Sequence, residues 1–171
     1  MSNVVVRRVE SKKDLKKFVK VPFHVHRDHP EWVPPLIMER MDFLNRKKNP
    51  YFDHAEVELL IAERDGVPVG RISAQIDSRW DEYRGGNDGQ FGFFETIDDA
   101  EVADALLDAG CEWLAGKGRE KVYGPMDFTT NDEIGIQIEG FDIRPVILEN
   151  CHQPYVKDLV EGNGFTKAMD L

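Results

Sequence analysis

The sequence lacks several features that would assign it to a large class of proteins. No apolar run is longer than a few residues, which excludes a membrane-spanning helix. The opening Met1-Ser2-Asn3-Val4 is too short, and charge follows it too soon, for a secretory signal. We therefore expect a cytoplasmic protein with no membrane partner. Only two cysteines occur, Cys111 and Cys151, and a reducing compartment favours two free thiols.

Positive charge is also scarce. Lys and Arg number 22 against 32 Asp and Glu, so the net charge is −10 and we expect no general nucleic-acid binding. Residues 1–20 are the exception, because their seven basic side chains outnumber Glu10 and Asp14 by five. A basic stretch of this kind is typical of a solvated helix face.

Little in the sequence favours a metal or phosphate site. His24, His26 and His29 lie close together, but neighbouring prolines predict a loop without a defined ligand face. We expect ordinary polar contacts there and no metal. The glycine-rich stretch 85–89 belongs to a predicted flexible loop at 78–90, and no helix opens directly after it, so it is not a phosphate cradle.

Periodicity and caps predict the elements that open the chain. Ser11 followed by Asp14 is a capping pattern that marks a helix start. Pro22 and three later prolines rule out regular structure after that helix. The expected elements are a strand at 4–9, a helix at 12–19, an irregular segment at 24–35 and a helix at 36–45.

A β-hairpin is the clearest local element. The stretches 55–63 and 67–77 alternate between apolar and polar residues or are filled with apolar ones. Asp65-Gly66 between them is a strong tight-turn signal.

The most informative stretch is a junction between a strand and a helix. The aromatic strand 91–95 runs into a turn at 96–99 and then into an amphipathic helix at 99–117. The first N–H groups of a helix have no partner inside it, so such a junction can bind a phosphate. Glycine is absent from this turn and carboxylates are present, which opposes a phosphate there.

The remaining pattern completes one domain over 1–171. We expect a strand at 121–124, a long connection at 125–150, a helix at 154–161 and a last strand at 165–171. Strands mixed with helices in this order predict an α/β fold, with one central mixed sheet and helices on both faces.

Several motifs carry a resemblance to a known superfamily. They are Ile61 to Ile72, with its Val-Gly-Arg-Ile ending, Leu159 to Phe165, Tyr123-Gly124-Pro125-Met126, Asn131 to Gly135, Glu139 to Asp142, and His152 to Tyr155. In this order they resemble the Gcn5-related N-acetyltransferase (GNAT) superfamily. They are most similar to an uncharacterised bacterial branch whose members are the N-terminal part of a longer chain.

The resemblance implies acyl transfer from acetyl-CoA to an amine of a small molecule or peptide. It implies that Phe93, Phe94 and Glu95 line the slot for the pantetheine arm, with Glu95 as catalytic base. The pyrophosphate turn would be the run Thr96, Ile97, Asp98, Asp99 and Ala100. In this superfamily a tyrosine on the last helix protonates the departing thiolate, but Val160 stands at that position here. Tyr155, one helical turn earlier, is therefore the candidate general acid.

Trp80 and Tyr83 flank predicted mobile segments and are candidates for the acceptor pocket, with packing anchors as the alternative. Asn131 and Glu133 are candidates to contact the acceptor amine, with a side-chain-closed turn as the alternative.

Two alternatives remain open at the level of the whole chain. The acidic turn and Val160 also fit a degenerate, non-catalytic GNAT-fold module for binding or assembly. The sheet ends early for this superfamily, so its final strand is missing unless a homodimer or a second GNAT-like domain completes it.

Overall fold

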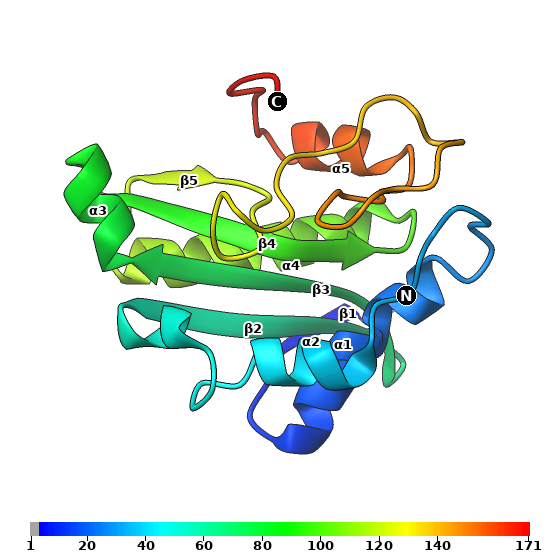
Figure 1. Cartoon of the computed structure of the whole chain (residues 1–171), viewed down its shortest axis with the longest axis horizontal. Coiled ribbons are helices and arrows are strands. Elements are labelled where there is room, and N and C mark those ends of the chain that lie inside the picture. Colours follow the sequence, from blue (N-terminus) through cyan, green and yellow to red (C-terminus); the bar gives the residue numbers. More distant parts are fainter. Residues whose placement is uncertain (1–3) are drawn as a thin grey trace.

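The computed structural model describes residues 4–171 and contains one five-stranded sheet. The strands follow their sequence order, and the pairs β1 to β4 are antiparallel, whereas β4 and β5 are parallel (Figure 1). This is the mixed α/β arrangement that the sequence predicted. The strands are β1 (Val4–Arg8), β2 (Ala55–Arg64), β3 (Val67–Asp77), β4 (Asp88–Thr96) and β5 (Lys121–Tyr123).

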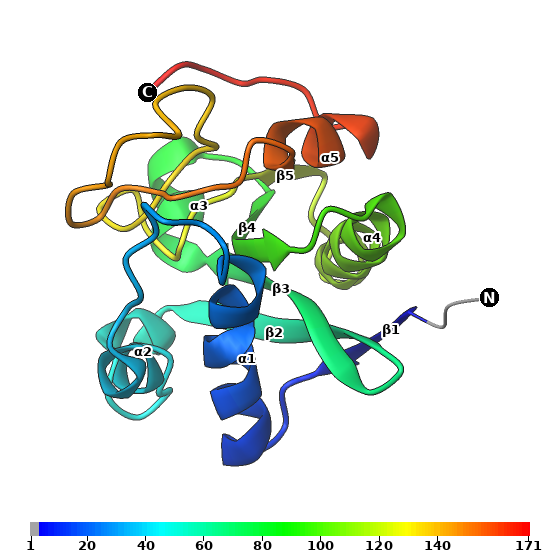
Figure 2. The ribbon, with the colours of Figure 1, turned by 90° about the vertical axis from the view of Figure 1, so that its right-hand side faces the viewer.

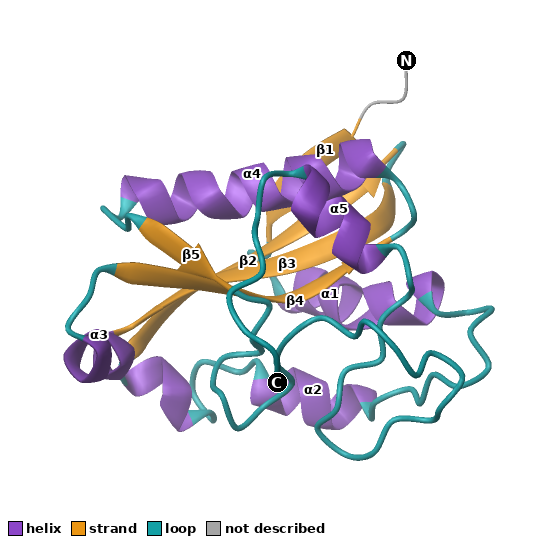
Figure 3. Cartoon of the chain, turned by 90° about the horizontal axis from the view of Figure 1, so that it is seen from above, coloured by secondary structure: helices purple, strands orange, loops and turns teal. Residues whose placement is uncertain are grey.

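Helices cover both faces of the sheet, as expected. Figure 2 shows α4 and α5 on one face and α1 and α2 on the other, and Figure 3 shows the same layers from above. The helices are α1 (Lys12–Val25), α2 (Ile37–Phe43), the 3-10 turn η1 (Pro50–Asp53), α3 (Ser78–Arg84), α4 (Ala100–Gly116) and α5 (Val156–Gly162). No helix within residues 4–171 is long and apolar enough to cross a membrane.

Small residues in the sheet allow α4 to lie close to it. A Cβ on Gly70 in β3 would lie 2.7 Å from Leu106, and one on Gly89 in β4 would lie 2.6 Å from Leu114. Both leucines are fully buried. Leu106 belongs to the larger core cluster, which joins β2, β3, β4, α4 and α5.

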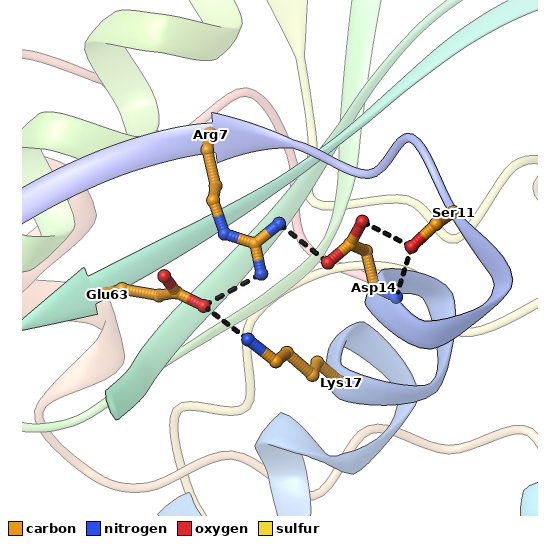
Figure 4. A network of polar contacts seen from close by, with 5 residues as sticks. All are labelled: Arg7, Ser11, Asp14, Lys17 and Glu63. Carbon is orange, nitrogen blue, oxygen red and sulfur yellow. Dashed lines mark hydrogen bonds and ion pairs between the residues drawn. The ribbon is translucent and has the colours of Figure 1, made fainter. Parts of the chain in front are cut away.

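The opposite face is built on aromatic rings and on ion pairs. Phe128, from the connection after β5, stacks on Tyr51 with ring centroids 4.5 Å apart, and both belong to the second core cluster. At the start of α1, Ser11 and Asp14 form the predicted cap. Figure 4 shows how that cap continues into the sheet: Arg7 bridges Asp14 and Glu63, and Glu63 also pairs with Lys17. The basic first segment is therefore partly used to fix α1 to β1 and β2.

The predicted hairpin is confirmed. β2 pairs with β3 from Ala55↔Asp77 to Arg64↔Val67. The turn residues Asp65 and Gly66 both have positive φ, 52° and 78°, as the favoured two-residue hairpin turn requires.

Three sequence predictions were wrong. Helix α1 continues through Pro22 to Val25, because the carbonyl that Pro22 leaves unpaired, that of Phe18, accepts a hydrogen bond from Arg71 at 3.3 Å. The expected flexible loop at 78–90 contains α3, which Asp77 caps, and the start of β4. Residues 165–171 form no strand; Phe165 packs on Phe91 instead, with ring centroids 5.3 Å apart.

The sheet opens where β4 and β5 separate. Regular pairing between these parallel strands covers only Asp88↔Lys121 to Gln90↔Tyr123. One further backbone hydrogen bond, from Met126 N to Phe91 O at 2.8 Å, follows before the connection turns away. Opposite Ile72 of β3, strand β4 holds an extra residue, and Phe93 there has a φ of 48°. The irregular end of β4 therefore lies beside this opening.

Candidate functional site

Glu95 lies near the end of β4, on the face covered by α1. Its Oε2 is 2.8 Å from Nε2 of His26, which caps the C-terminus of α1. The His26 side chain is fully buried, and that of Glu95 is 16% exposed. Among the polar contacts of residues 4–171, Glu95 uses only Oε2.

The surroundings keep Glu95 ionised. Burial by itself raises the pKa of a carboxyl group, but the hydrogen bond and attraction of His26, together with Arg71 and His152, outweigh it and hold the pKa of Glu95 below its ordinary value of 4.5. Arg71 pairs in register with Glu95 across β3 and β4. A carboxylate that stays ionised at neutral pH can accept a proton.

Aromatic rings fix the plane of His26. The His26 ring stacks on Trp32 with centroids 5.1 Å apart and planes 13° apart, and Trp32 meets Phe23 edge to face. The His29 ring also lies against His26, with centroids 5.6 Å apart, and its Nδ1 is 3.4 Å from Nδ1 of His26 and 3.8 Å from Sγ of Cys151. Of the three histidines predicted to make ordinary loop contacts, His26 and His29 are thus part of a packed cluster, whereas His24 is exposed.

Two long segments meet over this cluster. His29 Nε2 is 3.5 Å from the carbonyl oxygen of Phe141, and Arg144 pairs with Glu31 at 3.8 Å. Figure 3 shows the connection between β5 and α5 running beside the loop between α1 and α2. His152, in the same connection, is buried, and burial lowers the pKa of its ring.

A second buried polar cluster adjoins the aromatic core. Asp127 accepts a hydrogen bond from the backbone N–H of Phe93 at 2.6 Å. Burial raises the pKa of Asp127 to about 7; the Phe93 N–H, Arg71 and Arg40 lower it, and Glu133 raises it. Arg71 lies between the rings of Phe18 and Phe93, 5.0 and 5.4 Å from their centroids.

The candidate slot residues divide between the two faces. The side chain of Phe94 packs under α4, and that of Phe93 packs on the opposite face, so both are core residues. Only their backbone groups could contact a pantetheine arm. Tyr155, the candidate acid, donates its hydroxyl to Thr96 O at 2.8 Å. Burial, Glu95 and Asp98 raise the pKa of Tyr155, so it stays protonated.

The turn before α4 is acidic and already capped. Asp99 accepts hydrogen bonds from the N–H groups of Glu101 and Val102 and pairs with Arg64 at 2.6 Å. The hydrogen bond with Arg64 is the main reason that the pKa of Asp99 is lowered. Ile97 N–H is bonded to Val69 O, and the neighbours Asp98 and Ala100 are exposed. A diphosphate here would meet carboxylates rather than a glycine-rich cradle.

The candidate acceptor residues do not gather at Glu95. Trp80 and Tyr83 belong to α3, which directly follows the last residue of β3, Asp77. Glu95 pairs with Arg71, six positions before that end of β3, so α3 lies at the other end of the sheet. Asn131 is exposed in a turn whose Thr129 and Asp132 side chains hydrogen bond at 2.6 Å. Glu133 pairs with Arg40, near Asp127.

Neither of two surface hollows lies at Glu95, and the described residues form no metal site. Two hollows of about 570 and 370 Å³ lie between α4 and the β1–β2 edge and are lined by Glu58 and Trp113 among others. Neither borders Glu95. Over residues 4–171, His, Cys, Asp and Glu form no group of three able to hold a metal ion.

Comparison with solved structures assigns the fold. An aminoglycoside acetyltransferase from a soil metagenome, in complex with sisomicin, matches 98% of this chain and 91% of its own, with a TM-score of 0.59 and 14% identity. A predicted acetyltransferase of Clostridium acetobutylicum with acetyl-CoA matches 99% of this chain and 96% of its own, at 0.58 and 13%. The chain therefore has the α/β fold of the GNAT acetyltransferases.

Comparison with curated proteins finds much closer sequences. Bacterial ceramide synthase of Caulobacter vibrioides (strain NA1000 / CB15N) is 42% identical over 164 residues, which is 95% of this chain and 43% of that protein. Protein YghO of Escherichia coli (strain K12) is 39% identical over 167 residues, 98% of this chain and 43% of that protein. The chain thus spans less than half the length of these two relatives. No family model matches it.

Proposed function

We propose that this chain is an acyltransferase domain that transfers an acyl group from an acyl-CoA thioester to an amine, with Glu95 as the general base. The observation that carries the proposal is the Glu95 carboxylate: it is ionised, mostly buried and held through Oε2 by His26. The acetyltransferase fold supports the same interpretation, since coenzyme A and acetyl-CoA are bound in structures that share it.

The proposed reaction needs one base and one acid. The amine nitrogen attacks the thioester carbonyl carbon; an N–C bond forms and the C–S bond breaks. The surplus N–H proton passes to Oε1 of Glu95, and the thiolate takes a proton from the Tyr155 hydroxyl or from water. Exchange with water resets both side chains. Glu95 lies near the end of β4, and Tyr155, the residue before α5, contacts Thr96 O there.

The donor fits this chain in part. The opening between β4 and β5 can take a narrow pantetheine arm along the backbone of residues 93–96. The diphosphate would lie near α4, where Arg64 is the neighbouring cation and Asp98, Asp99 and Glu101 are anions. We therefore expect weaker binding of the diphosphate than a glycine-rich turn would give.

The relative's name supplies a first acceptor to test. Ceramide is an amide between a fatty acid and a long-chain amino alcohol, so a ceramide synthase forms an N-acyl bond. We propose the same bond type here, with a long-chain amine as acceptor and a fatty acyl group tested beside acetyl.

A non-catalytic module is the second candidate, and one observation favours it. Two backbone groups at the end of β4 are already used inside the chain, because Asp127 binds Phe93 N–H and Tyr155 binds Thr96 O. A thioester arm has to displace these contacts.

Calorimetry with acetyl-CoA and palmitoyl-CoA separates the two candidates. The variants are a double change, Asp98→Asn with Asp99→Asn, and Glu95→Gln. We expect the double variant to bind at least as tightly as the natural protein, because it removes two repelling charges while Asn can still cap α4. Donor binding should survive Glu95→Gln, whereas acylation of sphinganine should fall at least about 100-fold. Absence of binding in all three proteins would favour the non-catalytic module.

A further inference from the structure

His26 is built into the molecule more firmly than a helix-capping residue needs to be. Its ring is fully buried and is stacked on Trp32, and the His29 ring lies beside it with centroids 5.6 Å apart. Its Nε2 contacts Glu95 at 2.8 Å and its Nδ1 lies 3.4 Å from His29. Both ring nitrogens therefore have a defined neighbour, and the plane of the ring is fixed.

The contact with Glu95 determines which nitrogen carries a proton. An ionised carboxylate has no hydrogen to donate, so Nε2 of His26 must be the donor. A stacked ring cannot rotate freely, so this N–H fixes the position of Oε2. With Oε2 held, Oε1 is the carboxylate oxygen that makes no hydrogen bond within residues 4–171.

We propose that His26 is the positioning residue for Glu95, holding Oε2 through its Nε2–H so that Oε1 takes the proton of the acceptor amine. This inference rests on the proposed acyl transfer. Trp32 fixes the ring plane, and His29 lies against the other nitrogen. His26 itself touches no reacting atom.

Other charged or titratable groups around Glu95 also affect its titration. Arg71 reaches it from β3, and the connection before α5 contributes further groups. Those groups are His152, Cys151 and Tyr155, all of which precede the first residue of α5. His26 alone among them shares a hydrogen bond with Glu95 in the described part of the chain, so the variants below leave the rest in place.

Two variants separate the hydrogen bond from the packing. His26→Gln keeps a donor near the position of Nε2 but cannot titrate. His26→Phe keeps a ring to stack on Trp32 but has no donor. His24→Gln is the matched control, because His24 is exposed on the same helix. Thiol release from palmitoyl-CoA with sphinganine is measured for all of them from pH 5 to pH 9.

We expect His26→Phe to lower kcat by about 10- to 100-fold, the cost of a misplaced catalytic group, with KM for the acyl donor unchanged. Without its strongest hydrogen bond, the buried Glu95 should gain its proton at higher pH, so the acidic limb of kcat/KM should move up by about one pH unit. His26→Gln should recover most of kcat. A purely structural role would reduce the folded fraction and leave the limb in place.

The outcomes are distinct. If the natural protein is active and both His26 variants match His24→Gln in kcat and pH profile, the inference is overturned and the proposed function stands. If His26→Phe does not fold, His26→Asn replaces it, because the shorter amide cannot reach Oε2 of Glu95. A lower kcat with an acidic limb moved to higher pH then supports the inference, and a kcat and limb equal to those of His24→Gln overturn it. If the natural protein transfers no acyl group, the proposed function fails and the inference fails with it.

Discussion

Replacing Asp127 by asparagine should stabilise the protein above neutral pH. The raised pKa of Asp127, about 7 against an ordinary 3.8, means that the folded state prefers the protonated form. The contribution of this group to stability is therefore fully present below about pH 4 and is lost as the pH rises to about 7 and beyond. The amide of the Asp127→Asn variant would keep an oxygen for the Phe93 N–H and carry no charge at any pH.

The magnitude follows from the separation of the two pKa values. Each pH unit between the folded and unfolded pKa corresponds to about 1.4 kcal/mol, so the full penalty approaches about 4 kcal/mol. Asp127 is only partly enclosed, and water screens part of this penalty. We expect a gain of about 2 kcal/mol at pH 8 that shrinks toward zero near pH 4.

Urea unfolding of the natural protein and Asp127→Asn at pH 4, 6 and 8 measures the gain. Asp142→Asn is the matched control, because Asp142 is an exposed carboxylate in the same connection, and it should change the free energy of unfolding by less than about 0.5 kcal/mol. If Asp127→Asn is less stable than the natural protein at pH 8, or if its effect is independent of pH, the argument from burial of the charge is refuted.

Four further substitutions test the packing and the cap of α4. Gly92→Ala should lower the free energy of unfolding in urea by about 3 kcal/mol, because its Cβ would overlap the backbone carbonyl of Met126. Gly116→Ala, with open space around it, is the control and should be neutral or stabilise by about 0.5 kcal/mol. Equal effects of the two substitutions would contradict the close approach of Gly92 to Met126. Asp99→Ala removes the cap of α4 and should lower stability by about 1 kcal/mol, and a thermal melt with an unchanged midpoint would exclude that role. Leu106→Ala should cost about 2–5 kcal/mol; a loss under about 1 kcal/mol would mean that α4 collapses into the space.

Most of the fold could be predicted from the sequence because the residues that indicate each element are neighbours in the chain. The hairpin depends on Asp65-Gly66, whose positive φ values a two-residue turn requires, and α4 depends on an apolar face with a capping Asp99. The prediction failed where a residue far along the chain changed the effect of a local sequence signal. Pro22 predicts a helix end, and only the Arg71 guanidinium, 49 positions further along the chain, provides the partner that lets the helix continue.

The candidate site was readable only in part. Glu95 could be singled out because a carboxylate at a strand-to-helix junction is conspicuous in a sequence. His26 could not, because nothing within α1 indicates that its ring meets a residue 69 positions away. The sequence therefore determined the order of strands and helices, the turns and one half of the candidate site. The tertiary structure alone decided the partners of Glu95, Asp127 and Arg71, because buried charges are set by groups that approach through space from other elements.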